Sequence, residues 1–392
     1  MKRREFLNTG LALSAAALSG HLTNSANSSS AAQAQEASKP QESAPSAFKK
    51  VKIAQIGVRH EHASGKMNSL KMLPEYYEIV GIAAESPEWE KKHRGDAVYK
   101  DIPWMSQEEL LALPGLEAVA VETEMTELLP AARRCAERGL AMHVDKPLGQ
   151  NLDECRETLE LCRKNNVLLQ PGYMFRTNQA IRLAIKAVRE GWLGEIHDLR
   201  ANMNRNDVAP DFRRWLATYR GGGMYDFGSH LIDFVIEMLG APEEIRVFER
   251  PDPTDGLNDN TLSVFLYPKT IAQIRVTERA IDGFANRHLS ITGSKGSFLL
   301  DPLEKWERDP ATGKMFPLNV RLTLAEANAE YDKGTHHLAL EPFNDRYVGQ
   351  LIDLAQFIRG EKENPYTFEH ELLVQRAILA GSGYIPWESN KT

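Results

Sequence analysis

Between Val51 and Arg176, short runs of apolar and β-branched residues alternate with longer amphipathic stretches. Runs without a polar face are typical of parallel strands that helices cover on both sides. We expect about half a dozen of these strand–helix units to form a doubly wound parallel sheet of the Rossmann type in an α/β chain. This domain is predicted to span residues 49–176. Its strands are read from "VKIAQIGV", "EIVGIAAE", "EAVAVET", "AMHVDKPL" and "VLLQPGYMF".

After Asn178 the pattern changes. A helix, "QAIRLAIKAVREGW", leads to consecutive segments with period-two alternation, "EIHDLRANM", "TLSVFLYP", "IAQIRVTERA" and "HLSITGSKGSFLLD". This alternation predicts a largely antiparallel sheet with one open face. We therefore expect a C-terminal α+β domain over residues 177–392, whose last helices pack back on the body. The open face also makes this sheet a candidate surface for a homo-oligomer.

The N-terminus reads as a targeting segment and not as part of the fold. Adjacent Arg3 and Arg4 precede Phe6 and Leu7 and a mild run, "LALSAAALSG", which is about half the ~20 residues that a membrane-spanning helix needs. We interpret residues 1–34 as a Tat-type export signal and residues 35–48 as a flexible tether, and expect a periplasmic or other extracytoplasmic protein without a stable membrane span.

Charge and cysteine usage narrow the function classes. The formal net charge is −7, and the absence of a basic tract after the signal argues against nucleic acid as a partner. The three cysteines do not form a disulfide framework, since Cys155 and Cys162 lie too far apart on one predicted helix to be bridged.

The segment "IGVRHEHASGKM" follows the first predicted strand, where a dinucleotide fold has its glycine loop. Gly57 stands at the expected place, but Gly65 comes too late to complete the usual spacing. Glu85, at the end of the second predicted strand, is placed to bind both ribose hydroxyls and to repel a 2′-phosphate.

Two further segments carry groups suited to proton transfer. Lys146 in "HVDKPLG" follows what we count as the fifth strand, at the sheet edge where ligands bind in open α/β folds. In "GGGMYDFGSHLIDFVIEMLG", Asp226 and His230 lie four residues apart, which would place them on one face of a helix. His230 has the side chain suited to moving a proton near neutral pH.

Together with "PGYMFR", these segments resemble the Gfo/Idh/MocA oxidoreductases in order and spacing, from Lys49 to the C-terminus. The resemblance implies NAD or NADP, with NAD favoured by Glu85, and a small carbohydrate or polyol substrate. It implies that Lys146, Asp226 and His230 are the catalytic Lys, Asp and His, and that Arg176 lies near cofactor or substrate. It also admits redox-neutral chemistry through a keto intermediate, as in glycoside cleavage or epimerisation. The expected cofactor-binding residues are Gly57, Val58, Arg59, His60, Glu85, Thr123, Asp145, Lys146 and Arg176.

The sequence departs from the family pattern on the nucleotide side. Asp145 stands where the family has Glu before Lys-Pro, and the segment after what we count as the fourth strand is rich in acids, with Glu122, Glu124 and Glu127. We expect these acids to point to solvent at a helix start.

Two readings of the bulky loop therefore remain open. In one, NAD binds with Arg59 or His60 donating to phosphate. In the other, His60, His62 and His143, with a carboxylate, hold a divalent metal such as zinc or manganese for a nucleotide-free lyase or hydratase. A non-catalytic carbohydrate-binding protein is a third reading.

Overall fold

The computed structural model describes residues 49–206, 209–305, 308, 310–312, 315–342 and 345–388, all within one compact unit, Ala47–Thr392. The export signal expected at residues 1–34 and the tether expected at 35–48 lie outside the described residues. Among the described helices, none is both long and apolar enough to cross a bilayer.

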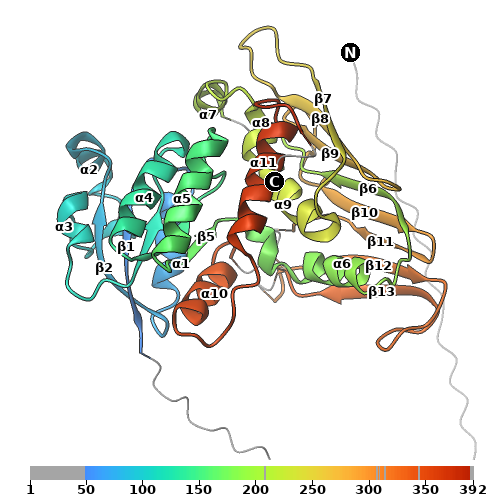
Figure 1. The fold of residues 1–392 in the computed structure, drawn as a ribbon, viewed down its shortest axis with the longest axis horizontal. Helices are drawn as coiled ribbons and strands as arrows, with labels where there is room; N and C mark the ends of the chain where they lie inside the picture. The colour runs from blue at the N-terminus through green and yellow to red at the C-terminus, as the bar shows by residue number, and fades with distance from the viewer. Residues whose placement is uncertain are drawn as a thin grey trace, which may run out of the picture. The chain divides into compact units, whose positions relative to one another are not determined.

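The first part of the chain forms a parallel five-stranded sheet in the order β2-β1-β3-β4-β5 (Figure 1). Helices alternate with its strands, which confirms the predicted α/β architecture with a Rossmann-type sheet. The strands are β1 (Val51–Ile56), β2 (Tyr77–Ala83), β3 (Ala118–Val121), β4 (Ala141–Val144) and β5 (Leu169–Pro171). The helices are α1 (Ala63–Lys71), α2 (Pro87–His93), α3 (Gln107–Leu111), α4 (Leu128–Glu137) and α5 (Leu152–Lys164), with short 3-10 turns at Ala97–Tyr99, Met125–Glu127 and Met174–Thr177.

The sheet has five strands, one for each of the five segments quoted from the sequence, rather than the half a dozen units that we expected. Lys146 therefore follows the fourth strand and not the fifth. Beyond β2, the sheet is extended by a single parallel bridge between Ile82 and Trp104. Two hydrogen bonds hold this bridge: the Ile82 N–H donates to Pro103 O at 2.9 Å, and the Met105 N–H donates to Ile82 O at 3.1 Å. Pro103 has no N–H for a longer ladder, which explains why the pairing stops there. With this bridge, the order matches a six-stranded Rossmann sheet whose third strand is one residue long.

The strand order reverses between β1 and β3, so their following loops face each other at the carboxyl edge of the sheet. Gly57 makes this approach close. Its φ is +98°, and a Cβ there would lie 2.5 Å from the carbonyl carbon of Glu122. The His60 N–H also donates to Glu122 O at 3.2 Å. These contacts fix the loop that carries Arg59, His60 and His62.

The second part of the chain is built on an eight-stranded sheet in the order β13-β12-β11-β10-β6-β9-β8-β7. The β6–β9 pair is parallel and the other pairs are antiparallel, which confirms the largely antiparallel sheet. Alternate residues of β8 and β9 are buried. The strands are β6 (Ile196–Asn202), β7 (Glu244–Glu249), β8 (Asn260–Leu266), β9 (Ile271–Thr277), β10 (His288–Gly293), β11 (Gly296–Leu300), β12 (Leu318–Leu324) and β13 (Gly334–Leu340).

Helices join this sheet to the first one. They are α6 (Gln179–Arg189), α7 (Pro210–Leu216), α8 (Gly222–Asp226), α9 (Gly228–Leu239), α10 (Val348–Ile358) and α11 (Phe368–Gly381). Helix α9 packs on β9, and α11 lies between α9 and α5 (Figure 1). Leu351, Leu354 and Ala355 of α10 share a buried cluster with Val51 and Ile53 of β1. The last two helices therefore pack back on the body; the domain boundary near residue 176 stays a prediction.

The helix expected to carry both Asp226 and His230 is instead two helices that meet at Phe227. The Ser229 hydroxyl donates to Asp226 O at 2.6 Å, and Gly228 packs so closely that a Cβ would lie 2.4 Å from Met224 Sδ. Asp226 therefore ends α8, while His230 lies in the first turn of α9.

All three cysteines are free and buried, Cys135 in α4 and Cys155 and Cys162 in α5. Burial in apolar surroundings raises the pKa of Cys135 and of Cys162 to about 12 and raises that of Cys155 as well.

Candidate functional site

The loop after β1 contributes to two cavities. The larger one, of about 700 Å³, lies at the carboxyl ends of β2 and β3 and is lined in part by Arg59, Glu85, Trp89 and Thr123. The smaller one, of about 290 Å³, is lined from the same loop by Glu61 and His62 and from elsewhere by Lys146 and His230, together with residues of the second half of the chain.

In the larger cavity, Glu85 is held by the loop. Its carboxylate accepts from the Val58 N–H at 3.2 Å and from the Arg59 N–H at 3.2 Å. Burial raises the pKa of Glu85, and these backbone donors oppose that rise. Glu85 thus lies beside the loop backbone, in the place where a Rossmann-fold acid meets ribose hydroxyls.

Arg59 occupies the position of the second loop glycine. Its guanidinium lies 3.0 Å from Glu124 Oε2 and stacks over Trp89, 5.0 Å from the ring centroid. Glu124 also accepts from Trp215 Nε1 at 2.7 Å and from the Tyr219 hydroxyl.

The expectation that the acids after the third strand point to solvent is therefore wrong for two of them. Glu124 is buried because it links Arg59 to two aromatic donors, and Glu122 is fully buried, so that desolvation raises its pKa well above the usual range. Glu127 is exposed, as expected.

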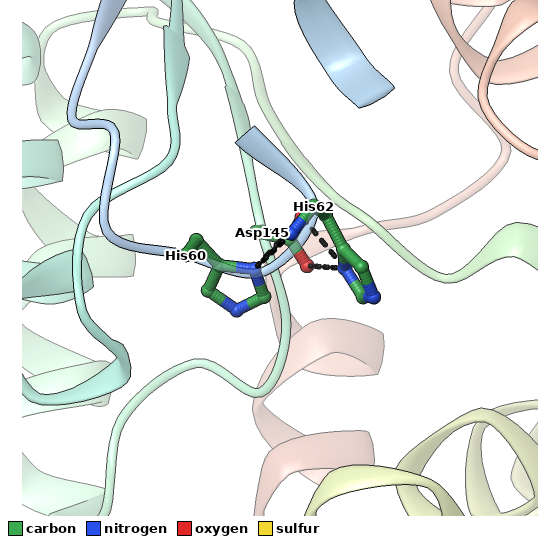
Figure 2. A group of neighbouring side chains, drawn as sticks. All are labelled: His60, His62 and Asp145. Atoms are coloured by element: carbon green, nitrogen blue, oxygen red, sulfur yellow. Dashed lines mark hydrogen bonds and ion pairs between the residues drawn. The ribbon is translucent and has the colours of Figure 1, made fainter. Parts of the chain in front are cut away.

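His60, His62 and Asp145 form a compact group at the start of α1 (Figure 2). Asp145 Oδ2 lies 3.7 Å from His60 Nδ1 and 3.2 Å from His62 Nδ1. Burial lowers the pKa of His60 to about 4. Burial would also lower that of His62, but Asp145 and Glu61 raise it to about 9. The group therefore pairs a neutral imidazole and a charged one with a carboxylate.

His143 does not join this group, which corrects the metal set of the second reading: Asp145 stands where we expected His143. The His143 ring accepts from the Lys66 ammonium and contacts Gln170 Oε1 at 2.8 Å through its other nitrogen. Lys66 Nζ also lies 3.6 Å from Asp145 Oδ2. A buried lysine thus already brings positive charge to the cluster.

Lys146 and His230 line the smaller cavity, and Asp226 is paired with Lys146. Lys146 Nζ donates to both the carboxylate and the main-chain oxygen of Asp226, the latter at 3.1 Å. Burial favours the neutral amine, but Asp226, Asp145 and Glu61 raise the pKa of Lys146 above its ordinary value. Lys146 is therefore a cation.

His230 lines the same cavity as Lys146 and is uncharged. Burial and the Lys146 cation lower the pKa of His230 well below 6.5. Among the described residues, its Nδ1 atom has no hydrogen-bond partner, and the rings of Tyr173 and Phe175 stand edge-on to it. The site thus presents an uncharged imidazole beside an ammonium, which is the combination needed to take a proton from a hydroxyl and to stabilise the resulting oxyanion.

Arg176, expected near cofactor or substrate, lines neither cavity. Its guanidinium is buried between Asp233, at 2.6 Å, and Glu371, at 2.6 Å, and so ties α9 to α11. We revise its role to a structural one. Val58 and Thr123 lie on the two facing loops, and their part in cofactor binding stays a prediction.

Sequence reasoning missed Lys66 and three arginines. Lys66 could have been found, because it falls with Ala63, Met67 and Leu70 on the buried face of α1. Arg205, Arg287 and Arg346 reach the smaller cavity from three separate loops, so no local pattern links them.

The comparisons with known proteins agree with this geometry. Residues 51–173 match the family described as "Oxidoreductase family, NAD-binding Rossmann fold", and residues 181–299 match the "GFO/IDH/MocA C-terminal domain". The chain belongs to the Gfo/Idh/MocA oxidoreductases.

Relatives of this family differ in the compounds named for them. Trans-1,2-dihydrobenzene-1,2-diol dehydrogenase of Bos taurus is 28% identical over 243 residues, covering 59% of this chain and 69% of the bovine protein. The aldose-aldose oxidoreductase of Caulobacter crescentus, complexed with glycerol, has a TM-score of 0.69 at 20% identity, covering 86% of this chain and 97% of its own.

An oxidoreductase of Agrobacterium radiobacter in complex with NAD+, L-tartaric acid and magnesium has a TM-score of 0.71 at 16% identity, covering 86% of this chain and 96% of its own. At such identities the two structural similarities establish the shared fold.

Proposed function

We propose that this protein is an NAD-dependent oxidoreductase that interconverts a hydroxyl and a carbonyl on a carbohydrate or polyol, and that it keeps its nucleotide through the catalytic cycle. The observation that carries this proposal is that Lys146, paired with Asp226, and His230 line one cavity together with residues of the first loop of the NAD-binding fold.

The residues present fit a dinucleotide. Gly57 allows the close approach of the two facing loops, and Glu85 has a carboxylate beside a cavity of about 700 Å³, large enough for an adenosine group. Arg59 supplies positive charge where a Rossmann loop meets phosphate, which offsets the loss of the second glycine. Glu85 favours NAD over NADP because a carboxylate repels a 2′-phosphate.

The catalytic roles follow from charge and position. A bound nicotinamide would supply the hydride acceptor for the hydroxyl-bearing carbon. His230, neutral at physiological pH, takes the hydroxyl proton, so that hydride and proton together leave a carbonyl. Lys146 donates to the same oxygen and stabilises its developing negative charge. Asp226 orients the ammonium and keeps it protonated.

Retention of the nucleotide follows from the expected export. A free NAD pool is not expected outside the cytoplasm, so a hydride removed from a substrate has to be returned within the same cycle. The proposal therefore favours redox-neutral chemistry through a keto intermediate.

The first test is to denature the purified protein and to measure NAD(H) and NADP(H) in the supernatant. We expect close to one equivalent of NAD(H), and substrate turnover without added nucleotide and without net NADH. Turnover that depends on added NAD would contradict retention.

Substitution separates the catalytic roles from folding. His230→Gln and Lys146→Met should each lower kcat by about 10²–10⁴-fold while nucleotide content stays near that of the wild type. The unfolding midpoint should stay near the wild-type value in His230→Gln and fall in Lys146→Met, because Asp226 is then buried without its cation. His197→Gln, on the exposed side of β6, is the matched control. Unchanged kcat in His230→Gln would remove His230 from proton transfer.

A second candidate function is favoured by the group of Figure 2, whose donor atoms all lie within 4.8 Å of one another. His60, His62 and Asp145 could hold a divalent metal for nucleotide-free lyase or hydratase chemistry. About one equivalent of zinc or manganese by elemental analysis, with no released nucleotide, would favour this candidate over the first.

A further inference from the structure

The smaller cavity is markedly basic. Besides Lys146, it is lined by Arg205, Arg287 and Arg346. Glu61 is the acidic side chain among the described residues that line it. The arginines come from the second half of the chain, whereas Glu61 and His62 in the lining come from the loop after β1.

Two of these arginines are held rigidly by one acid. Glu304 accepts from Arg287 NH1 and lies 3.1 Å from Arg346 NH2. Burial would raise the pKa of Glu304, but the two guanidinium groups lower it. Two positive groups and one negative group leave this trio with a net charge of +1. Arg287 also donates through Nε to Asn204 O at 2.9 Å, which fixes its fork.

The positive charges are close enough to disfavour one another. Burial is the main reason that the pKa of Arg287 is lowered, and the Arg205 and Arg346 charges lower it further. Arg205 stacks over Phe227, 4.4 Å from its ring centroid, and Arg287 stacks over Phe284 at 3.9 Å. Aromatic faces thus help to hold the guanidinium groups of Arg205 and Arg287 at the cavity.

We propose that the substrate carries an oxyanion, a carboxylate or a phosphate, which Arg205, Arg287 and Arg346 bind while its reacting hydroxyl lies at Lys146 and His230. This inference rests on the proposed function for the identity of the reacting end. Preformed arginine forks match planar carboxylates and phosphates with paired hydrogen bonds. The protein therefore acts on acidic sugars, such as uronates or sugar phosphates, rather than on neutral ones.

The test compares matched probes: D-glucose, D-glucuronate and D-glucose 6-phosphate, with acetate and inorganic phosphate alone. Binding is followed by calorimetry and by protection against thermal unfolding, at fixed ionic strength. We expect at least one acidic sugar to bind ten times more tightly than glucose or more. The ratio of the affinities for glucuronate and glucose 6-phosphate shows whether the site prefers a carboxylate or a phosphate.

Arg346→Gln and Arg205→Gln should each remove most of this preference, whereas Lys186→Gln, an exposed control, should keep it. Arg346 is the safer substitution because its side chain is 33% exposed. If no anion protects the wild type more than it protects Arg346→Gln, the proposal is overturned.

Its failure is distinguishable from that of the proposed function. His230→Gln should still bind the acidic sugar without turning it over. Equal turnover of neutral and acidic sugars would sink the anion site and leave the oxidoreductase intact. Tight binding of acidic sugars without any redox step, in a protein that releases no nucleotide, would support the anion site and contradict the proposed oxidoreductase function.

Discussion

Gly57 shows how far a single residue can determine the conformation of the loop that follows β1. The glycine is required by its positive φ and by the main chain of Glu122, whereas the next two glycine positions of a Rossmann loop carry Arg59 and His62. The requirement for Gly57 could be predicted from its place after a buried strand. What Arg59 contacts could not, because Glu124 and Trp89 lie on other segments.

We expect Gly57→Ala to lower the free energy of unfolding by about 3 kcal/mol, since it adds backbone strain to a steric clash. Chemical denaturation measures the change. Gly95→Ala is the matched control, because a Cβ at Gly95 would have no atom within 4 Å. Equal effects of the two substitutions would contradict the close packing of the two loops.

Arg176 is a second position where a single residue changed the interpretation. Its substitution by Met leaves Asp233 and Glu371 buried without their cation, so we expect a loss of about 3–5 kcal/mol of stability. Arg163→Met removes an exposed ion pair with Glu369 and should cost below about 1 kcal/mol. Nucleotide content per folded molecule should be unchanged in Arg176→Met; selective loss of nucleotide would return Arg176 to the site.

Most of the secondary structure elements follow from local sequence. The buried parallel strand β3 is a continuous apolar run, and Asn151 caps α5 with its side chain, so both elements are recognisable. The break between α8 and α9 is not, because it depends on how Gly228 packs against Met224. The third Rossmann strand, reduced to Trp104, also escapes a pattern that needs several residues.

Helix α10 shows that an element can belong to a sheet far from it in sequence. Leu354 packs among the residues that cover β1 and α1, so Leu354→Ala should cost about 2–5 kcal/mol. Gln356→Ala, on the partly exposed side of the same helix, is the control and should change stability by less than about 0.5 kcal/mol. A small effect of Leu354→Ala would mean that α10 is not part of the core.

At the scale of the whole molecule, buried histidines set how stability depends on pH. Burial lowers the pKa of His143 to about 3 and that of His60 to about 4, and also lowers that of His230. The unfolded chain takes up these protons near pH 6.5 and the folded chain does not, so stability is lost as pH falls below 6.5. His62, with its pKa raised to about 9, acts oppositely, and its contribution is lost as pH rises through 9.

We therefore expect unfolding midpoints in urea to be highest near neutral pH and to fall on both sides. His143→Gln should make the acid limb shallower by up to about 1.4 kcal/mol per pH unit, while the exposed control His197→Gln should not. An acid limb that is identical in both variants would show that His143 does not take part in the transition.

The assembly of the active site is likewise a property of the whole molecule. Lys146, Asp226 and His230 could be chosen from sequence because they stand in segments that resemble the family's in order and spacing. The basic wall opposite them could not, because Arg205, Arg287 and Arg346 are brought together by the folding of three loops around Glu304.

The three buried thiols have a practical consequence. Because burial raises the pKa of each thiol above its ordinary value, thiolate is scarce in the native state, and alkylating reagents can reach the sulfur atoms when α4 and α5 separate from the core. The rate of cysteine alkylation is therefore a measure of how often this part of the molecule opens. Counting alkylated cysteines against time by mass spectrometry would report how often this half of the fold opens, and how far a bound nucleotide or sugar slows it.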